Sequence, residues 1–194
     1  MKNNHAFRLI GSWASIFSGV ILFLAHLLIF LSKTDSGSIL GNSLVFTAHM
    51  VVVFGLIGIY EIQAQNLKTI SLIGMLLSVI GTMIVSAIVF VEIAAASGVN
   101  VDPIFNAPVV NTIYSVGPLF FVFGMIILGI TTMITKLPTR IGGFLLILGT
   151  IVFALASIVG FGKDLIEVIG SAITGGGFFW SGVSLLKTKN KLFS

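Results

Sequence analysis

The charged residues of this chain are confined to short clusters, and six long charge-free segments separate the clusters. These segments are residues 9–32, 36–60, 69–91, 103–135, 141–162 and 168–186. A helix needs about 20 mostly apolar residues to cross a hydrocarbon core about 30 Å thick. Only 8% of the residues are charged, whereas soluble domains have about 25%. The pattern predicts an all-α integral membrane protein, a bundle of six transmembrane helices.

The predicted helices cover approximately residues 8–32, 39–62, 69–96, 109–135, 140–162 and 165–187. The links between them are no longer than about a dozen residues, which is typical of a loop and far too short for a folded domain. The 194 residues are therefore predicted to form a single transmembrane domain. The longest link, residues 97–108, contains several asparagines and prolines, and we expect it to cover one end of the bundle as a lid.

The basic residues are distributed unequally between the two ends of the predicted bundle. Eight of the ten lie on the side of the termini, and only Lys33 and Lys163 lie on the other side. Lys and Arg accumulate in cytoplasmic loops, so we expect both the N and the C terminus to be cytoplasmic. The net charge of +4 then reflects topology and attraction to membrane lipids, and we expect no nucleic-acid partner. The absence of cysteine excludes disulfides and thiolate metal sites.

Small residues recur at helical spacing in two of the apolar segments. Gly11, Ser15 and Gly19 form one stripe, and Gly177 and Ser181 form a shorter one. Small residues let helix backbones approach in lipid, where helix association has no hydrophobic driving force. We expect the stripes to pack helices of one chain together; the alternatives are a homo-oligomer and a larger membrane partner.

A helix break is predicted at Gly117 and Pro118, in the fourth apolar segment. Proline removes one backbone donor and clashes with the preceding helical turn. Non-helical backbone at membrane depth is tolerated where it is buried in protein or lines a watery cavity. The break therefore points toward a binding site.

Two segments recur in the same order along the chain. Residues 73–82 and 141–150 both begin with Ile-Gly and end with Gly-Thr, and Val-Phe-Gly stands at both 53–55 and 122–124. The second and third helices would then correspond to the fourth and fifth. Both pairs run in the same direction, so the pattern predicts a parallel repeat.

Several short motifs carry a family resemblance. They are His49 with the glycine-rich residues 54–60, the glycines at 124 and 129, and the turn Lys-Leu-Pro-Thr-Arg-Ile-Gly-Gly at 136–143. Together they resemble a broad group of uncharacterised small bacterial multi-pass membrane proteins, in which the turn typically reads Pro-Arg-Trp-Ala-Gly. Here Thr139 separates the proline from the arginine, and Ile141 replaces the tryptophan. The resemblance implies six helices in a bacterial cytoplasmic membrane, but it implies no functional residue.

Ionisable side chains within a spanning segment are costly and are functional candidates by default. At a rise of ~1.5 Å per residue, His26 lies roughly 9 Å and His49 roughly 15 Å from the outer end of its helix. Glu92 lies near the outer end of the third helix, and Asn111 and Tyr114 lie near the outer start of the fourth. We expect these five residues to line an outward-facing polar cavity with His49 at its centre.

Asp102, Asp164 and Glu167 belong to the same side of the predicted bundle and are interpreted as solvated charges. A histidine titrates near pH ~6.5, within the physiological range, so the cavity is predicted to bind or transport a small solute or proton. One alternative is a non-catalytic accessory or structural subunit of a membrane complex. No cofactor is predicted, although imidazole suits haem iron and divalent metals, which leaves a b-type haem or a metal at His26 and His49 as a further alternative. The scattered serines identify no catalytic nucleophile with its base, so enzyme activity is not expected.

Overall fold

The computed structural model describes residues 5–34, 37–63, 67–134, 139–159 and 162–190. Helices make up the regular structure of these residues, and no strand occurs among them. The helices are α1 (His5–Ser32), α2 (Ile39–Gln63), α3 (Lys68–Ala96), α4 (Asp102–Phe105), α5 (Pro108–Ile134), α6 (Arg140–Ala156) and α7 (Lys163–Asn190). The predicted all-α fold is therefore confirmed for the part of the chain that the structure describes.

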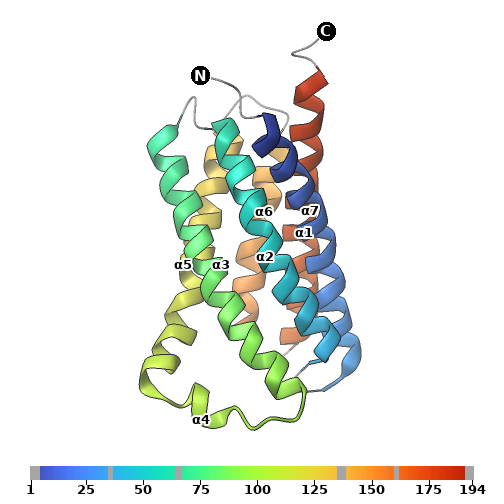
Figure 1. The fold of residues 1–194 in the computed structure, drawn as a ribbon, viewed down its shortest axis with the longest axis vertical. Helices are drawn as coiled ribbons and strands as arrows, with labels where there is room; N and C mark the ends of the chain where they lie inside the picture. Colours follow the sequence, from blue (N-terminus) through green and yellow to red (C-terminus); the bar gives the residue numbers. More distant parts are fainter. Residues whose placement is uncertain (1–4, 35–36, 64–66, 135–138, 160–161, 191–194) are drawn as a thin grey trace.

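Six of these helices form a closed ring in the order α1, α2, α3, α5, α6 and α7, and α7 packs against α1 (Figure 1). Successive long helices run in opposite directions. The described chain begins and ends at the same end of the ring, which we call the terminal end. The short helix α4 lies at the opposite end, which we call the α4 end.

Five helices, α1, α2, α3, α5 and α7, are long and apolar enough to cross a membrane. The shorter apolar helix α6 has 17 residues and ends at Ala156. At ~1.5 Å per residue it is about 26 Å long, slightly less than a hydrocarbon core. The chain therefore has the helices of a membrane protein, and the count of six crossings stays a prediction.

Glycine sets how closely the helices approach. Each member of the α1 stripe faces a glycine of a neighbouring helix: Gly11 faces Gly58, Ser15 faces Gly55, and Gly19 faces Gly175. A Cβ atom added at Gly58 would lie only 2.7 Å from the Cα atom of Gly11, so the two backbones are in direct contact. Such contact provides the packing that helices in lipid need. The prediction that the stripes pack helices within one chain is confirmed.

One glycine contact recurs in three helical hairpins. Gly55 of α2 packs on Ser15 of α1, Gly124 of α5 packs on Ser78 of α3, and Gly177 of α7 packs on Leu146 of α6. The glycines of the matched sequence segments also face the other helix of their own hairpin. Gly74 and Gly81 of α3 face α5, and Gly142 and Gly149 of α6 face α7. The repeated unit of the structure is thus an antiparallel hairpin that occurs as α1–α2, α3–α5 and α6–α7. This unit is offset by one helix from the pairs proposed on sequence.

The residue after each hairpin glycine is buried inside the ring. Leu56, Met125 and Phe178 are each at most 1% exposed. They belong to a cluster, called here the apolar core, that comprises Val52, Leu56, Ile59, Met75, Met125, Leu128, Leu146, Phe178 and Leu185. The apolar core fills the interior between the middle of the ring and its terminal end.

Helix α5 is continuous across Pro118, so the predicted break does not interrupt it. The packing of α5 does change there. Residues 111–116 are all exposed, whereas Gly117 is buried, and a Cβ atom added at Gly117 would clash with Ile84 of α3. The first turns of α5 stand away from the ring, and the predicted 97–108 lid contains the short helix α4 beside them (Figure 1).

Candidate functional site

The α4 half of the ring contains a chain of ionisable side chains that runs inward from α7 to α1. The Lys163 ammonium lies 3.6 Å from Oε1 of Glu167, one helical turn away. The other oxygen of Glu167, Oε2, lies 4.0 Å from Nδ1 of His26. Among the described residues, the buried Nδ1 atom of His26 has no hydrogen-bond partner. The imidazole packs edge-on against Phe153 of α6, with ring centroids 4.9 Å apart.

His49 lies deeper, on α2. Its Nδ1 atom lies 2.9 Å from the backbone carbonyl of Val45, which can only accept, so the ring donates from Nδ1. In the neutral ring, Nε2 is then the acceptor. The ring packs against Phe121 of α5, with centroids 6.0 Å apart, and His49 is close enough to His26 for an electrostatic interaction.

The other predicted site residues lie nearer the α4 end. Glu92 on α3 interacts electrostatically with Lys163 and Glu167 across the ring, and Tyr114 on α5 interacts with all three. Tyr114 is 42% exposed and packs against Phe105 of α4, with ring centroids 5.1 Å apart. Asn111 is exposed on the first turns of α5. The structure therefore brings His26, His49, Glu92 and Tyr114 toward one region and leaves Asn111 at its edge.

Exposure falls from Lys163 to the two histidines. The Lys163 side chain is 56% exposed, that of Glu167 is 19% exposed and that of His26 is 8% exposed. Both His26 and His49 are buried residues, and His49 lies further from the α4 end. The polar groups thus form a graded route from the α4 end to the middle of the ring. We call His26, His49, Glu92, Lys163 and Glu167 the polar route.

Glu167 and Lys163 are the two members of the polar route that the sequence does not predict as site residues. The predicted helix begins at residue 165, so the sequence places Glu167 in its first turn and predicts a solvated charge. In the structure α7 begins at Lys163, and Glu167, in the second helical turn, lies 4.0 Å from His26 of α1. The spacing of Lys163 and Glu167, four residues apart on one helix, is the sequence signal that could have found it.

No family model, curated protein or solved structure matches the chain. The case for a functional site therefore rests on the geometry of the polar route itself.

A haem or metal fits these residues poorly. In the part of the chain that the structure describes, no three His, Cys, Asp or Glu residues are grouped so that they could hold a metal ion. Each imidazole already packs against an aromatic ring, His26 against Phe153 and His49 against Phe121. Helices α1 and α2 are also in contact beside His26, because a Cβ atom added at Gly41 would lie 3.2 Å from the carbonyl oxygen of Ala25. A porphyrin held between the two helices would have to separate them.

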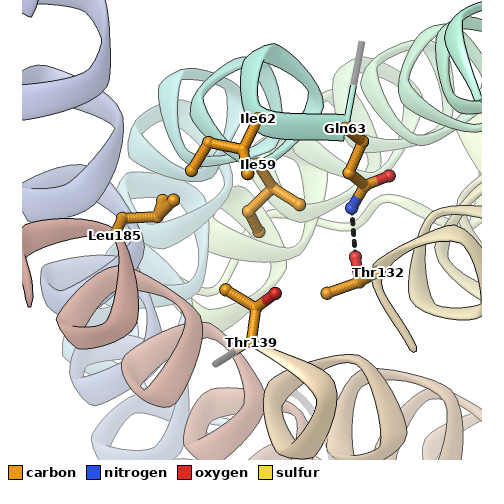
Figure 2. A pocket seen from close by; sticks show the side chains of 6 residues that line it. All are labelled: Ile59, Ile62, Gln63, Thr132, Thr139 and Leu185. Carbon is orange, nitrogen blue, oxygen red and sulfur yellow. Dashed lines mark hydrogen bonds between the residues drawn. The ribbon is translucent and has the colours of Figure 1, made fainter. Parts of the chain in front are cut away.

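A second polar cluster lies at the terminal end. Gln63 of α2 is 1% exposed, and its side-chain amide donates to Oγ1 of Thr132 (Figure 2). Its side-chain carbonyl accepts a hydrogen bond from Oγ1 of Thr131 at 2.5 Å, and Thr132 donates to the Leu128 carbonyl at 2.6 Å. These residues join α2 to α5. The consecutive threonines 131 and 132, in an otherwise apolar segment, are the sequence signal that could have found this cluster.

This cluster borders a narrow hollow lined by Ile59, Ile62, Gln63, Thr132, Thr139 and Leu185 (Figure 2). The hollow is too narrow for a water molecule. Gln63, Thr132 and Leu185 each stand eight residues after a hairpin glycine, at Gly55, Gly124 and Gly177. The hollow is therefore surrounded by equivalent positions of the three hairpins, which places it near the centre of the ring.

The apolar core separates the hollow from the polar route. Along α2, the buried residues Val52, Leu56 and Ile59 follow His49 at helical spacing and precede Gln63. Fourteen residues at ~1.5 Å each put His49 and Gln63 about 21 Å apart along the helix. The interior thus contains ionisable groups toward the α4 end, and the apolar core separates them from the neutral polar cluster at the terminal end.

Proposed function

We propose that this protein crosses a bacterial cytoplasmic membrane six times, with both termini in the cytoplasm, and that it binds and moves a small solute or proton. The α4 end then faces outward, because eight of the ten basic residues belong to the terminal side. The short helix α6 completes the sixth crossing, with residues 157–159 lying at the outer interface.

The single observation that carries this proposal is the graded polar route. Ionisable groups are costly within a membrane and usually line a pathway or a water-filled cavity. Here they come from α1, α2, α3 and α7 and converge inside one ring, while lipid-facing positions are apolar. A route that is polar on one side and closed on the other is the arrangement expected of a transporter in an outward-facing state.

Helix α4 and the exposed first turns of α5 serve as the cover of this route. Tyr114 and Phe105 pack together, which ties α4 to α5, so the two can move as a unit. The pivot is the segment at Gly117 and Pro118, where α5 joins the ring. Proline weakens the backbone hydrogen bonding of the helix at this point, as a pivot requires.

The test is a measurement of binding and flux with the purified protein. Thermal unfolding is followed in detergent with a panel of small solutes, and proton flux is followed in vesicles that contain a trapped pH-sensitive dye. We expect a solute-dependent rise in melting temperature or a proton flux above that of empty vesicles, and we expect His49→Leu to abolish it. An Asp164→Asn variant is the matched control, because it removes an exposed charge outside the polar route.

Other outcomes would overturn the proposal. If no solute raises the melting temperature and no flux occurs, or if His49→Leu behaves like the wild type, the route has no transport role. A larger protein that copurifies stoichiometrically in that case would favour the accessory-subunit function. A Soret band that is lost in His26→Ala would instead establish a haem protein.

A further inference from the structure

We infer that the ligand of the polar route is the proton, and that His26 and Glu167 share it. This inference rests on the proposed function and names the species that the route accepts. It is carried by the contact between the buried, unpartnered His26 Nδ1 and the Glu167 carboxylate.

The His26 imidazole and the Glu167 carboxylate are neighbours that do not bond to each other. At 4.0 Å, Nδ1 of His26 and Oε2 of Glu167 are too far apart for a hydrogen bond, and within the described structure Nδ1 has no other hydrogen-bond partner. A neutral imidazole nitrogen that lacks hydrogen and an ionised carboxylate both accept, so neither can bond to the other. One added proton turns the pair into a charge-assisted donor and acceptor, which form short and strong hydrogen bonds. A proton also needs no cavity.

The surroundings allow the proton to arrive from the α4 end and to go no further than the middle of the ring. Glu167 is part-exposed and is contacted by the exposed Lys163, so it can exchange protons with water at that end. From His26 the next titratable group inward is His49, whose Nε2 is an acceptor. Beyond His49, the apolar core offers no protonatable side chain.

The helices around His26 contribute charged or titratable groups from four elements, α2, α3, α5 and α7. Helix α2 contributes His49, α3 contributes Glu92 and α5 contributes Tyr114, while α7 contributes Lys163, Asp164 and Glu167. Helix α6 contributes the apolar ring of Phe153, and its one ionisable residue, Arg140, lies at the terminal end. Glu167 is the carboxylate that lies against His26, so it is the group whose removal should matter most.

The experiment is a pH titration of the histidine rings by NMR, with carbon-13-labelled histidine and the full chain in lipid nanodiscs. The chain has three histidines, and His5, near the N terminus, is an internal reference. A carboxylate within about 4–6 Å changes the proton affinity of its neighbour by about tenfold to a thousandfold. We therefore expect Glu167→Gln to weaken proton binding by His26 at least about tenfold and to leave His5 unchanged.

Two further variants sharpen the result. Asp164→Asn removes an equal charge from an exposed position of the same helix and should change His26 far less than Glu167→Gln does. Lys163→Gln removes the cation that competes for Glu167 and should strengthen proton binding by the pair. Equal effects of Glu167→Gln and Asp164→Asn on His26 would overturn the inference. If Glu167→Gln does not fold, an unchanged titration in Lys163→Gln would overturn it equally.

This outcome is separable from that of the proposed function. A titration of His26 that depends on Glu167, without flux in vesicles, would support the shared proton and overturn transport. If flux or solute binding occurs but Glu167→Gln leaves the titration of His26 unchanged, transport is supported and the shared proton is overturned.

Discussion

At the scale of single residues, two adjacent glycines of α7 have very different surroundings. A Cβ atom added at Gly175 would clash with the backbone carbonyl oxygen of Gly19, whereas one added at Gly176 would meet only a methyl group of Leu145 at 4.0 Å. We expect Gly175→Ala to destabilise the protein by about 1–3 kcal/mol, because overpacking forces two helix backbones apart. Unfolding titrations in mixed detergent micelles measure this change.

Gly176→Ala is the matched control for that experiment. The same methyl group, one residue further along the same helix, enters free space, so its effect should be within about 1 kcal/mol and can be stabilising, since alanine favours helix more than glycine. Equal losses in the two variants would show that helix propensity, and not contact between α1 and α7, decides the stability of this segment.

At the residue scale, the sequence predicted which histidines belong to the site but not which side chains they contact. His26 and His49 stood out because ionisable groups are rare in apolar segments, and depth could be estimated from the helical rise. The orientation of each ring could not be estimated, because it depends on which neighbouring helix the side chain meets. The contact of His26 with Glu167 joins α1 to α7, residues far apart in the chain, and no local pattern encodes it.

At the scale of helices, Gln63 links α2 to α5 near the terminal end. Its amide and carbonyl groups both bond to threonine hydroxyls, so an apolar side chain there would leave the buried Thr131 and Thr132 without these partners. We expect Gln63→Leu to cost about 1–2 kcal/mol of stability. Thermal unfolding in detergent measures the loss.

Thr112→Val is the control for Gln63→Leu. The Thr112 hydroxyl is exposed and bonds to the Pro108 carbonyl of its own helix. Its removal should change stability by less than about 0.5 kcal/mol, as for most surface substitutions. A Gln63→Leu variant that is as stable as Thr112→Val would mean that the polar cluster does not hold α2 and α5 together.

The positions of the helices were largely predictable, because charge-free runs and spanning helices have the same length. The ends of the helices were less predictable. Helix α7 begins at Lys163, before the charge-free segment 168–186, and α6 ends at Ala156, within the charge-free segment 141–162. The sequence predicted that α2 corresponds to α5 and α3 to α6, and the glycine contacts agree with this correspondence, but the grouping of the helices into three hairpins was not predicted. Sequence similarity identifies matching glycines such as Gly81 and Gly149, but only the packing shows which neighbouring helix each glycine faces.

At the scale of the whole molecule, the two halves of the ring differ in the kind of polar group that the described residues place inside: His26, His49, Glu92 and Glu167 lie toward the α4 end, whereas the buried polar side chains toward the terminal end are neutral amides and hydroxyls. Three hairpins with the same glycine contacts produce the ring, and the polar route departs from this repetition. Both histidines belong to the α1–α2 hairpin, and the two acids that accompany them come from the helices on either side, α3 and α7. The uneven placement of these charges within three similar hairpins is the reason that the proposed function is assigned to the half of the ring toward the α4 end.

The account as a whole depends on the α4 end facing outward, and cysteine labelling tests this most directly. The chain contains no cysteine, so single Asp164→Cys and Glu61→Cys variants can be labelled without background. Both positions are exposed: Asp164 lies in the first turn of α7, which begins at the α4 end, and Glu61 lies in the last turn of α2, which ends at the terminal end. A membrane-impermeant maleimide added to intact bacterial cells should label position 164, and it should label position 61 only after the cells are permeabilised. The reverse pattern would place the polar route on the cytoplasmic side and contradict the account.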